Sequence, residues 1–355
     1  MTDKQPPRIP EQKASRGQKW WYAFALCILV LGGGLFYVQQ QLTPPDRSGK
    51  AVEVEIKPGA GAVEIGVELE RKELIRNATF FKWYLSFEGK GSELKAGSYY
   101  LTQGMSMEEI TRVLVEGDAH YGTTQFTIPE GLNLEQIADK LADDGLVDKQ
   151  KFLDEADNGT FDYDFVAAIP KQEGMKHRLE GYLFPDTYEV MKDADEHVII
   201  DTMLKQTDAV LTPEWRAEMD KRQMTVHQIL TLASLVEREA RVSKERPTIA
   251  GVIYNRLHTD PPMKLQIDAT VQFALGKTKE TLLYEDLEID SPYNTYLHEG
   301  LPPGPIASPG RESIQAAIYP AQHDFLFYVT KNDGSGEHYF AATFAEHEQN
   351  IAKSQ

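Results

Sequence analysis

Glu239 is predicted to lie on the apolar face of a helix, where a carboxylate is unusual. Thr225 and Gln228 form a capping-box pattern, and the apolar residues that follow them recur at helical spacing. On a helix that turns about 100° per residue, Glu239 lies about 20° from Leu232, in the middle of the apolar stripe. Glu237 points to another face of the same helix, so the two carboxylates are not expected to share a cleft.

A carboxylate on a buried stripe has two explanations that the pattern alone leaves open. Burial disfavours the charged form and raises the pKa, which suits a general acid that protonates a glycosidic oxygen near neutral pH. Alternatively, Glu239 is an exposed helix-end residue, or it forms a buried ion pair with Arg241, Lys244 or Arg246.

Familiar metal-binding and nucleophile motifs are missing from the sequence. It contains no H-E-x-x-H string, no paired C-x-x-C and no calcium-binding loop, and it lacks a G-x-S-x-G elbow. Gly276-Lys277-Thr278 ends like a phosphate loop, but Val271 occupies the position of its first glycine. The sequence therefore predicts neither a metal nor a cofactor.

Charge is distributed unevenly along the 355 residues. The net charge is −18, from 37 Lys and Arg against 55 Asp and Glu. The segment 1–19 holds five basic and two acidic residues, a charge of +3, so the remainder carries −18 − 3 = −21. An acidic body lacks the Lys and Arg clusters that release counterions from nucleic acid, so a nucleic-acid partner is not expected.

The run from Trp20 to Val38 contains no charged residue. As a helix it would rise about 28 Å, which matches a bilayer core of roughly 30 Å, and aromatic residues stand at both of its ends. The basic tail before it predicts a cytoplasmic N-terminus and an extracytoplasmic body. The alternative is a signal peptide cleaved after Gly32-Gly33-Gly34, although the apolar run resumes at Leu35. The single cysteine, Cys27, lies inside the run and leaves none for disulfides.

An internal repeat with a spacing of 72 follows a short stalk, residues 39–52. The apolar anchors of the segment 56–81 recur in the segment 128–153, and Gly59 corresponds to Gly131. A shorter copy occupies 101–114. Each copy predicts a strand, a glycine turn and a helix with one apolar face.

Residues 53–120 resemble a LysM-like module, a small fold that docks on glycans containing N-acetylglucosamine. The aromatic residues there, Trp83, Tyr84, Tyr99 and Tyr100, are able to stack on sugar rings. Aromatic residues more often fill a core, so glycan binding by this module is one of two interpretations.

Several ordered motifs resemble the YceG-like family, whose members are endolytic murein transglycosylases. The motifs lie at 180–188, 232–240, 249–257, 264–271, 291–296 and 300–310. The likeness covers nearly everything after the apolar run. Departures from the family pattern are Ala269, where proline is common, and Ser308, where asparagine is frequent.

The resemblance implies a reaction and a set of site residues. The β-1,4 bond between N-acetylmuramic acid and N-acetylglucosamine is cleaved without water, and the muramic C6 hydroxyl closes on C1 to give a 1,6-anhydro end. One carboxylate acting first as acid and then as base is enough, and the second glutamate of the Glu-x-Glu string maps onto Glu239. Candidate substrate-binding residues are Asn255, Gln266, Asp268, Asn294 and Tyr296. The implied partners are murein glycan strands and the cell-wall synthases.

The predicted fold class is α+β throughout. We expect a cytoplasmic tail (1–19), a transmembrane helix (20–38), a stalk (39–52), a LysM-like module (53–120) and a mixed catalytic domain (121–355). This domain closes with strands near 324–330 and 338–340, and the apolar run 325–329 predicts a buried strand. Two other functions remain open. A hydrolytic muramidase would use Asp268 or another carboxylate to activate water, and a wall-binding scaffold would not need the acid.

Overall fold

The computed structural model describes residues 16–45, 51–117, 123–277, 279 and 281–355. The chain divides into two compact units, Met1–Thr123 (unit 1) and Thr124–Gln355 (unit 2). The predicted boundary at 120/121 and most of the predicted tail 1–19 lie outside the described residues.

The first described element of unit 1 is one long helix, α1 (Arg16–Leu42), which contains the predicted span 20–38 and extends into the predicted stalk. The side chains of 16–20 and 22–28 lie outside the described residues. Within what is described, no helix combines the length and the apolar character needed to cross a membrane. The side chains of Leu29, Leu31 and Leu35 are exposed, whereas Val38 and Leu42 pack against the core of unit 1.

The rest of unit 1 is a small two-stranded module. Its elements are β1 (Ala51–Ile56), α2 (Ala62–Arg71), α3 (Ala78–Glu88), β2 (Gly97–Thr102) and α4 (Met107–Glu116). The strands pair antiparallel, with Ile56 opposite Gly97. The predicted anchors Ile65 and Leu69 on α2 and Ile110 and Leu114 on α4 are all buried, which confirms the two helices predicted for this unit.

The second copy of the repeat lies in unit 2, apart from its first residue, Thr123. Its elements are β3 (Thr123–Thr127), α5 (Leu134–Asp143), α6 (Lys149–Asn158), the short α7 (Asp164–Ala167) and β4 (Thr187–Met191). We call residues 51–102 copy 1 and residues 123–191 copy 2. The first strand and first helix of the two copies begin 72 residues apart, and Gly59 and Gly131 both have positive φ, 84° and 79°. The predicted repeat is therefore present in the structure.

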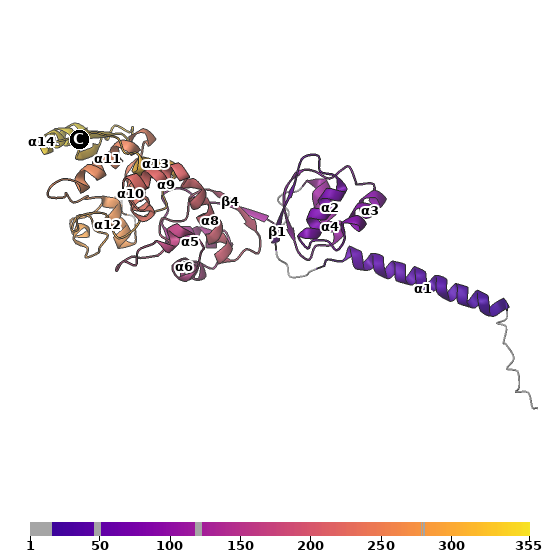
Figure 1. Ribbon diagram of the computed structural model, residues 1–355. Helices are drawn as coiled ribbons and strands as arrows, with labels where there is room; N and C mark the ends of the chain where they lie inside the picture. The colour runs from indigo at the N-terminus through magenta and orange to yellow at the C-terminus, as the bar shows by residue number, and fades with distance from the viewer. Residues whose placement is uncertain (1–15, 46–50, 118–122, 278, 280) are drawn as a thin grey trace, which may run out of the picture. The chain divides into compact units, whose positions relative to one another are not determined.

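Helices dominate the remainder of unit 2 (Figure 1). They are α8 (Glu196–Val210), α9 (Pro213–Lys221), α10 (Val226–Glu239), η1 (Ser243–Glu245), α11 (Arg246–Leu257), α12 (Asp268–Leu275), η2 (Asp286–Glu288) and α13 (Arg311–Ile318). Helix α10 packs against α11, α12 and α13, and most of its residues are buried. The helix predicted from the Glu239 stripe is thus a central element of the core.

Two antiparallel strands and a helix close the chain. Strand β5 (Phe327–Thr330) pairs with β6 (His338–Ala341), and α14 (Phe344–Ser354) packs on both. The expectation that 325–329 forms a buried strand is wrong, because every residue of β5 is only half-buried. With three separate two-stranded sheets among helices in the described residues, the fold is mixed, as the α+β class requires.

Candidate active site

Helix α10 fixes the position of Glu239. Its start is held by the predicted capping box, in which the Thr225 hydroxyl accepts from the Gln228 N–H and the Gln228 side chain accepts from the Thr225 N–H. The stripe residues Leu232 and Leu235 are fully buried. Glu239 is the last helical residue and is half-buried, so its carboxylate lies at the edge of the core.

Tyr328 on β5 is the direct partner of this carboxylate. Its hydroxyl donates to Glu239 Oε2 at 2.8 Å. Burial raises the pKa of Glu239 above the usual range, the Tyr328 hydrogen bond opposes that rise, and the negative charge of Asp268 adds to it. Glu239 therefore has the character of a carboxyl group that holds a proton longer than an exposed glutamate.

The ion-pair alternative for Glu239 does not fit the geometry. Arg246 reaches Glu237 at 3.3 Å and Glu312 at 3.1 Å, and Lys244 pairs with Glu337. No ion pair to Glu239 occurs among the residues that the structure describes. The charge of Glu239 is thus not neutralised by a bonded basic side chain.

Glu237 has a structural role that the sequence did not reveal. Its carboxylate accepts from Ser313 Oγ at 2.7 Å and from the Gly310 N–H at 3.0 Å. Helix α13 begins after Gly310, which offers no capping side chain. Because a helix start needs acceptors for its free N–H groups, the missing cap at Gly310 is the one feature of the sequence that indicates a distant acceptor such as Glu237.

Three further groups surround Glu239. Arg256 on α11 is buried, donates to the Leu326 and Leu265 carbonyls at 2.6 Å each, and is close enough to lower the pKa of Glu239. The Tyr296 hydroxyl donates to Asp268 Oδ1 at 2.5 Å. Of the predicted candidates, Asp268 and Tyr296 therefore lie together beside Glu239. Arg256 was not predicted as a site residue, although it belongs to the motif 249–257.

The other three candidates differ in how free their side chains are. The Asn255 amide donates to the carbonyls of His323 and Phe325, at 2.8 and 2.9 Å. The buried Asn294 amide donates to the Leu287 and Ile289 carbonyls, at 2.8 and 2.9 Å. Both amides hold loops in place. Gln266 is exposed and has a positive φ of 50°, so its side chain is presented to solvent from a constrained backbone.

A second buried carboxylate, Glu180, lies in copy 2. Its two oxygens accept from the Leu134 N–H at 3.0 and 3.2 Å, at the start of α5. Burial raises the pKa of Glu180 to about 7. It belongs to the motif 180–188, but its burial was not predicted. Within the described part of the chain, no group of three or more His, Cys, Asp or Glu side chains is placed to hold a metal ion.

Comparison with known proteins identifies the family. The YceG-like family model matches residues 54–353. An endolytic murein transglycosylase of Bacillus subtilis (strain 168) is 38% identical over 329 residues, covering 90% of this chain and 89% of that protein. An endolytic murein transglycosylase of Streptococcus pneumoniae is 35% identical over 92% of this chain, which spans only 63% of that relative.

A solved structure agrees with these matches. The crystal structure of a yceG-like protein from Listeria monocytogenes has a TM-score of 0.56 and 39% identity, and covers 85% of this chain and 99% of that one. The family model spans far more than half of the residues, and the B. subtilis relative is similar over most of its length. This chain therefore belongs to the YceG-like family.

Proposed function

We propose that this protein is a murein lytic transglycosylase and that Glu239 is its single acid and base. The observation that carries the proposal is the setting of Glu239, a half-buried carboxyl group with a raised pKa that receives one hydrogen bond from Tyr328 and no ion pair within the described structure. The relatives named as endolytic murein transglycosylases supply the substrate class.

The reaction needs one proton to move twice. Protonated Glu239 donates to the glycosidic oxygen as the bond from muramic C1 to that oxygen breaks, which releases the N-acetylglucosamine hydroxyl. Glu239, now ionised, accepts the proton of the muramic C6 hydroxyl, whose oxygen bonds to C1. The products are a 1,6-anhydro end and a free hydroxyl, and no water is consumed.

Two neighbouring side chains stabilise Glu239 in its ionised form, which acts as the base in the second step. The Tyr328 hydroxyl and the positive charge of Arg256 both favour the carboxylate form of Glu239. Asp268, the first residue of α12, and Tyr296, which donates to it, remain our candidates for substrate contact, together with the exposed Gln266. Asn255 and Asn294 are assigned to holding the loops, because their amides are already bonded to backbone carbonyls.

A hydrolytic muramidase is the alternative enzyme. It would need a carboxylate free to activate water, and Asp268 is exposed and close enough to affect the pKa of Glu239. Its contact with Tyr296 occupies one of its oxygens. The products separate the two activities, because hydrolysis leaves reducing ends whereas transglycosylation leaves anhydro ends.

The test is mass spectrometry of purified glycan strands treated with the full-length protein in detergent. We expect anhydromuramyl ends from the wild type and a loss of at least about 100-fold in rate from Glu239→Gln, since general acid–base catalysis contributes 10²–10⁴-fold. Glu214→Gln is the matched control, because Glu214 is an exposed helical glutamate on α9. It should retain the wild-type rate.

Three outcomes would contradict the proposal. Reducing ends in place of anhydro ends would assign the protein to the muramidases. Strand binding without any cleavage by the wild type would favour a scaffold. Anhydro ends formed by Glu239→Gln at the normal rate would remove Glu239 from the chemistry.

We also propose that residues 20–38 anchor the protein in the cytoplasmic membrane, with the N-terminus inside and the body outside. The charge-free run and its basic tail support this. So does a row of aromatic rings that continues from α1 onto α3, in which Tyr37 contacts Phe80, Phe80 contacts Trp83 and Trp83 stacks on Phe87. Trp83 and Phe87 are exposed, as interfacial aromatic residues often are.

Anchoring limits how far the site can reach, so we propose that its substrate is glycan newly made at the membrane by the synthases. The LysM-like module of unit 1 would help to hold that glycan. A chain lacking residues 1–40 should release strands of a different length from those released by the full chain. Unchanged lengths would contradict the anchoring argument.

A further inference from the structure

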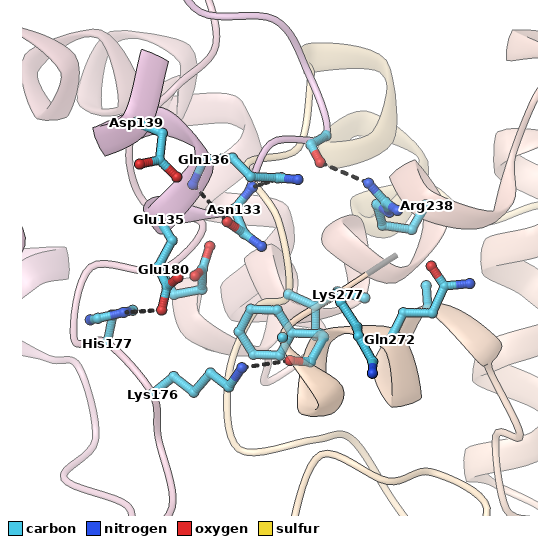
Figure 2. A pocket seen from close by; sticks show the side chains of 15 residues that line it. Asn133, Glu135, Gln136, Asp139, Lys176, His177, Glu180, Arg238, Gln272 and Lys277 are labelled. Carbon is cyan, nitrogen blue, oxygen red and sulfur yellow. Dashed lines mark hydrogen bonds and ion pairs between the residues drawn. The ribbon is translucent and has the colours of Figure 1, made fainter. Parts of the chain in front are cut away.

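A polar pocket of about 160 Å³ opens between four segments of unit 2 (Figure 2). Most of the lining comes from four segments, which are the turn before α5 with the start of that helix, the stretch before β4, the end of α10, and α12 with the residues just after it, and Ile306 completes it. Side chains from all four face one another in the view, among them Glu135, Lys176, Arg238 and Lys277. No motif in the sequence predicts this pocket, and the reaction scheme does not use it.

The pocket lies next to the proposed catalytic residue. Arg238 directly precedes Glu239, and Ala269, also in the lining, directly follows Asp268. Consecutive Cα atoms are about 3.8 Å apart, and side chains of adjacent helical residues point about 100° apart. The pocket therefore begins one residue before Glu239, on a neighbouring face of the end of α10.

Some charged groups of the pocket are already committed to protein partners. Lys176 donates to the Phe273 carbonyl at 2.6 Å and lies 4.7 Å from the centre of its ring. Asp139 pairs with Lys149 at 2.5 Å. The ion pair neutralises Asp139, and the Lys176 ammonium is held against Phe273 at the wall of the pocket.

Two cations and one carboxylate remain available. Arg238 makes one hydrogen bond, from Nη1 to the Gly131 carbonyl at 3.1 Å. The Lys277 ammonium has no bonded partner in the described part of the chain. Glu135 has only a long contact, 3.7 Å to His177. A ligand that satisfies all three carries carboxylates and an amine.

Under the proposed function, on which this inference rests, the glycan backbone itself does not explain these charges. Its N-acetylated sugar rings are neutral, whereas the peptide attached to the lactyl group of muramic acid bears free carboxylates and an amine. We infer that this pocket binds the stem peptide of the muramic acid at the cleavage site. Arg238 and Lys277 bind its carboxylates, and Glu135 binds its amine.

The experiment compares full-length protein on one strand preparation in two forms, with its peptides intact and with them removed by an amidase. The readout is the rate of anhydro-end formation, resolved into kcat and KM. We expect the wild type to have a kcat/KM about tenfold higher on peptide-bearing strands, in line with one good charge-assisted contact. Lys277→Gln and Arg238→Gln should each raise KM on those strands and leave kcat unchanged.

Lys151→Gln is the matched control, since Lys151 is an exposed lysine on α6 outside the pocket. It should behave as the wild type on both forms. A third preparation, in which the peptide carboxylates are amidated, should react as slowly as stripped strands.

The proposal is overturned if the wild type cleaves intact and stripped strands equally well, or if amidation leaves the rate unchanged. It is also overturned if Lys277→Gln slows both forms by the same factor, which would indicate a general effect on the fold or on glycan binding. Failure of the proposed function looks different, because no form of the strands would then yield anhydro ends.

Discussion

Copy 1 and copy 2 share a frame and differ in what is inserted into it. In both, a strand, a glycine turn and two helices lead to a second strand. In copy 1 the second helix reaches the second strand through residues 89–96, whereas in copy 2 that connection runs from 159 to 186. The longer connection holds α7, Lys176 and Glu180. The two copies thus share one frame, and copy 2 carries these pocket-lining side chains in a connection that is much shorter in copy 1.

The first helices of the two copies, α2 and α5, differ in the same way at single exposed positions. Val63 and Val67 on α2 are 50% and 55% exposed. The positions 72 residues later are Glu135 and Asp139, which line the pocket on α5. The buried faces of the helices are alike and apolar, so only the outward faces have diverged.

The largest expected effect tests whether the insertion is part of the folded core of copy 2. Glu180→Ala removes a buried side chain and leaves the Leu134 N–H without its acceptor, which should cost about 2–4 kcal/mol at pH 5. Hydrogen exchange of the full chain, read peptide by peptide, should show loss of protection in α5. Glu93→Ala, on the exposed connection of copy 1, should change stability by less than about 0.5 kcal/mol. Unchanged protection of α5 in Glu180→Ala would show that the insertion merely covers the copy.

A pH series sharpens the same contrast. Because burial raises the pKa of Glu180 to about 7 from its ordinary value of 4.5, the folded state binds this proton more tightly than the unfolded state. Below pH 4.5 the Glu180 carboxyl group is protonated in both the folded and the unfolded state, so its titration does not change the free energy of unfolding there. Stability should fall as the pH rises through 4.5 to 7, by at most about 3 kcal/mol, and the full loss persists above pH 7.

Glu180→Gln is the control for this prediction. His177 also loses stabilisation as the pH rises, because its hydrogen bond to Asp157 raises its pKa, so the wild-type slope has more than one source. The difference between wild type and Glu180→Gln isolates the carboxyl group. Equal slopes of α5 protection against pH would mean that Glu180 titrates as an exposed glutamate does.

A matched glycine pair tests the shared frame. Gly59 and Gly131 have φ values of 84° and 79°, and a Cβ atom at either would meet nothing closer than 3.8 Å. Each Gly→Ala change should therefore cost about 1–2 kcal/mol from backbone strain alone, in its own copy. Only Gly131→Ala should also slow anhydro-end formation, because strain at residue 131 shifts the backbone carbonyl that accepts from Arg238. If the two Gly→Ala changes lower hydrogen-exchange protection in their own copies by very different amounts, the two turns are not equivalent.

The features predictable from the sequence are those encoded within one segment. The 72-residue spacing and the stripe that ends at Glu239 arise from local periodicity, because helical neighbours lie three or four residues apart. The capping box of α10 is likewise contained in four residues.

The features that were missed join distant segments. Tyr328 lies 89 residues from Glu239, and Glu180 lies 46 residues from Leu134. Arg256 reads as an ordinary basic residue until its burial against β5 is known. Nothing in local spacing specifies which loop meets which helix, so the candidates Asn255 and Asn294 did not differ from Asp268 and Tyr296 until their hydrogen bonds were seen.

The smallest expected effect concerns the turn between the two helices of each copy. Copy 2 has Gly145 there, with φ 74°, and copy 1 has Glu73, with φ 57°. The Glu73 side chain is exposed. Glu73→Gly should relieve the left-handed strain of a residue with a Cβ atom, about 1–2 kcal/mol. It should also add about 0.5–1 kcal/mol of unfolded-state entropy, so we expect a net gain of up to about 1 kcal/mol, measured by exchange in α2 and α3.

The reciprocal change, Gly145→Glu, makes this small effect decisive. If the two turns are equivalent, copy 2 should lose about as much stability as copy 1 gains, because strain and entropy then act with opposite sign at the same backbone conformation. If Glu73→Gly destabilises copy 1 while Gly145→Glu also destabilises copy 2, then Glu73 makes interactions that offset its strain. The copies would in that case have diverged in the turn as well as in the insertion, and the frame would be less uniform than its 72-residue spacing suggests.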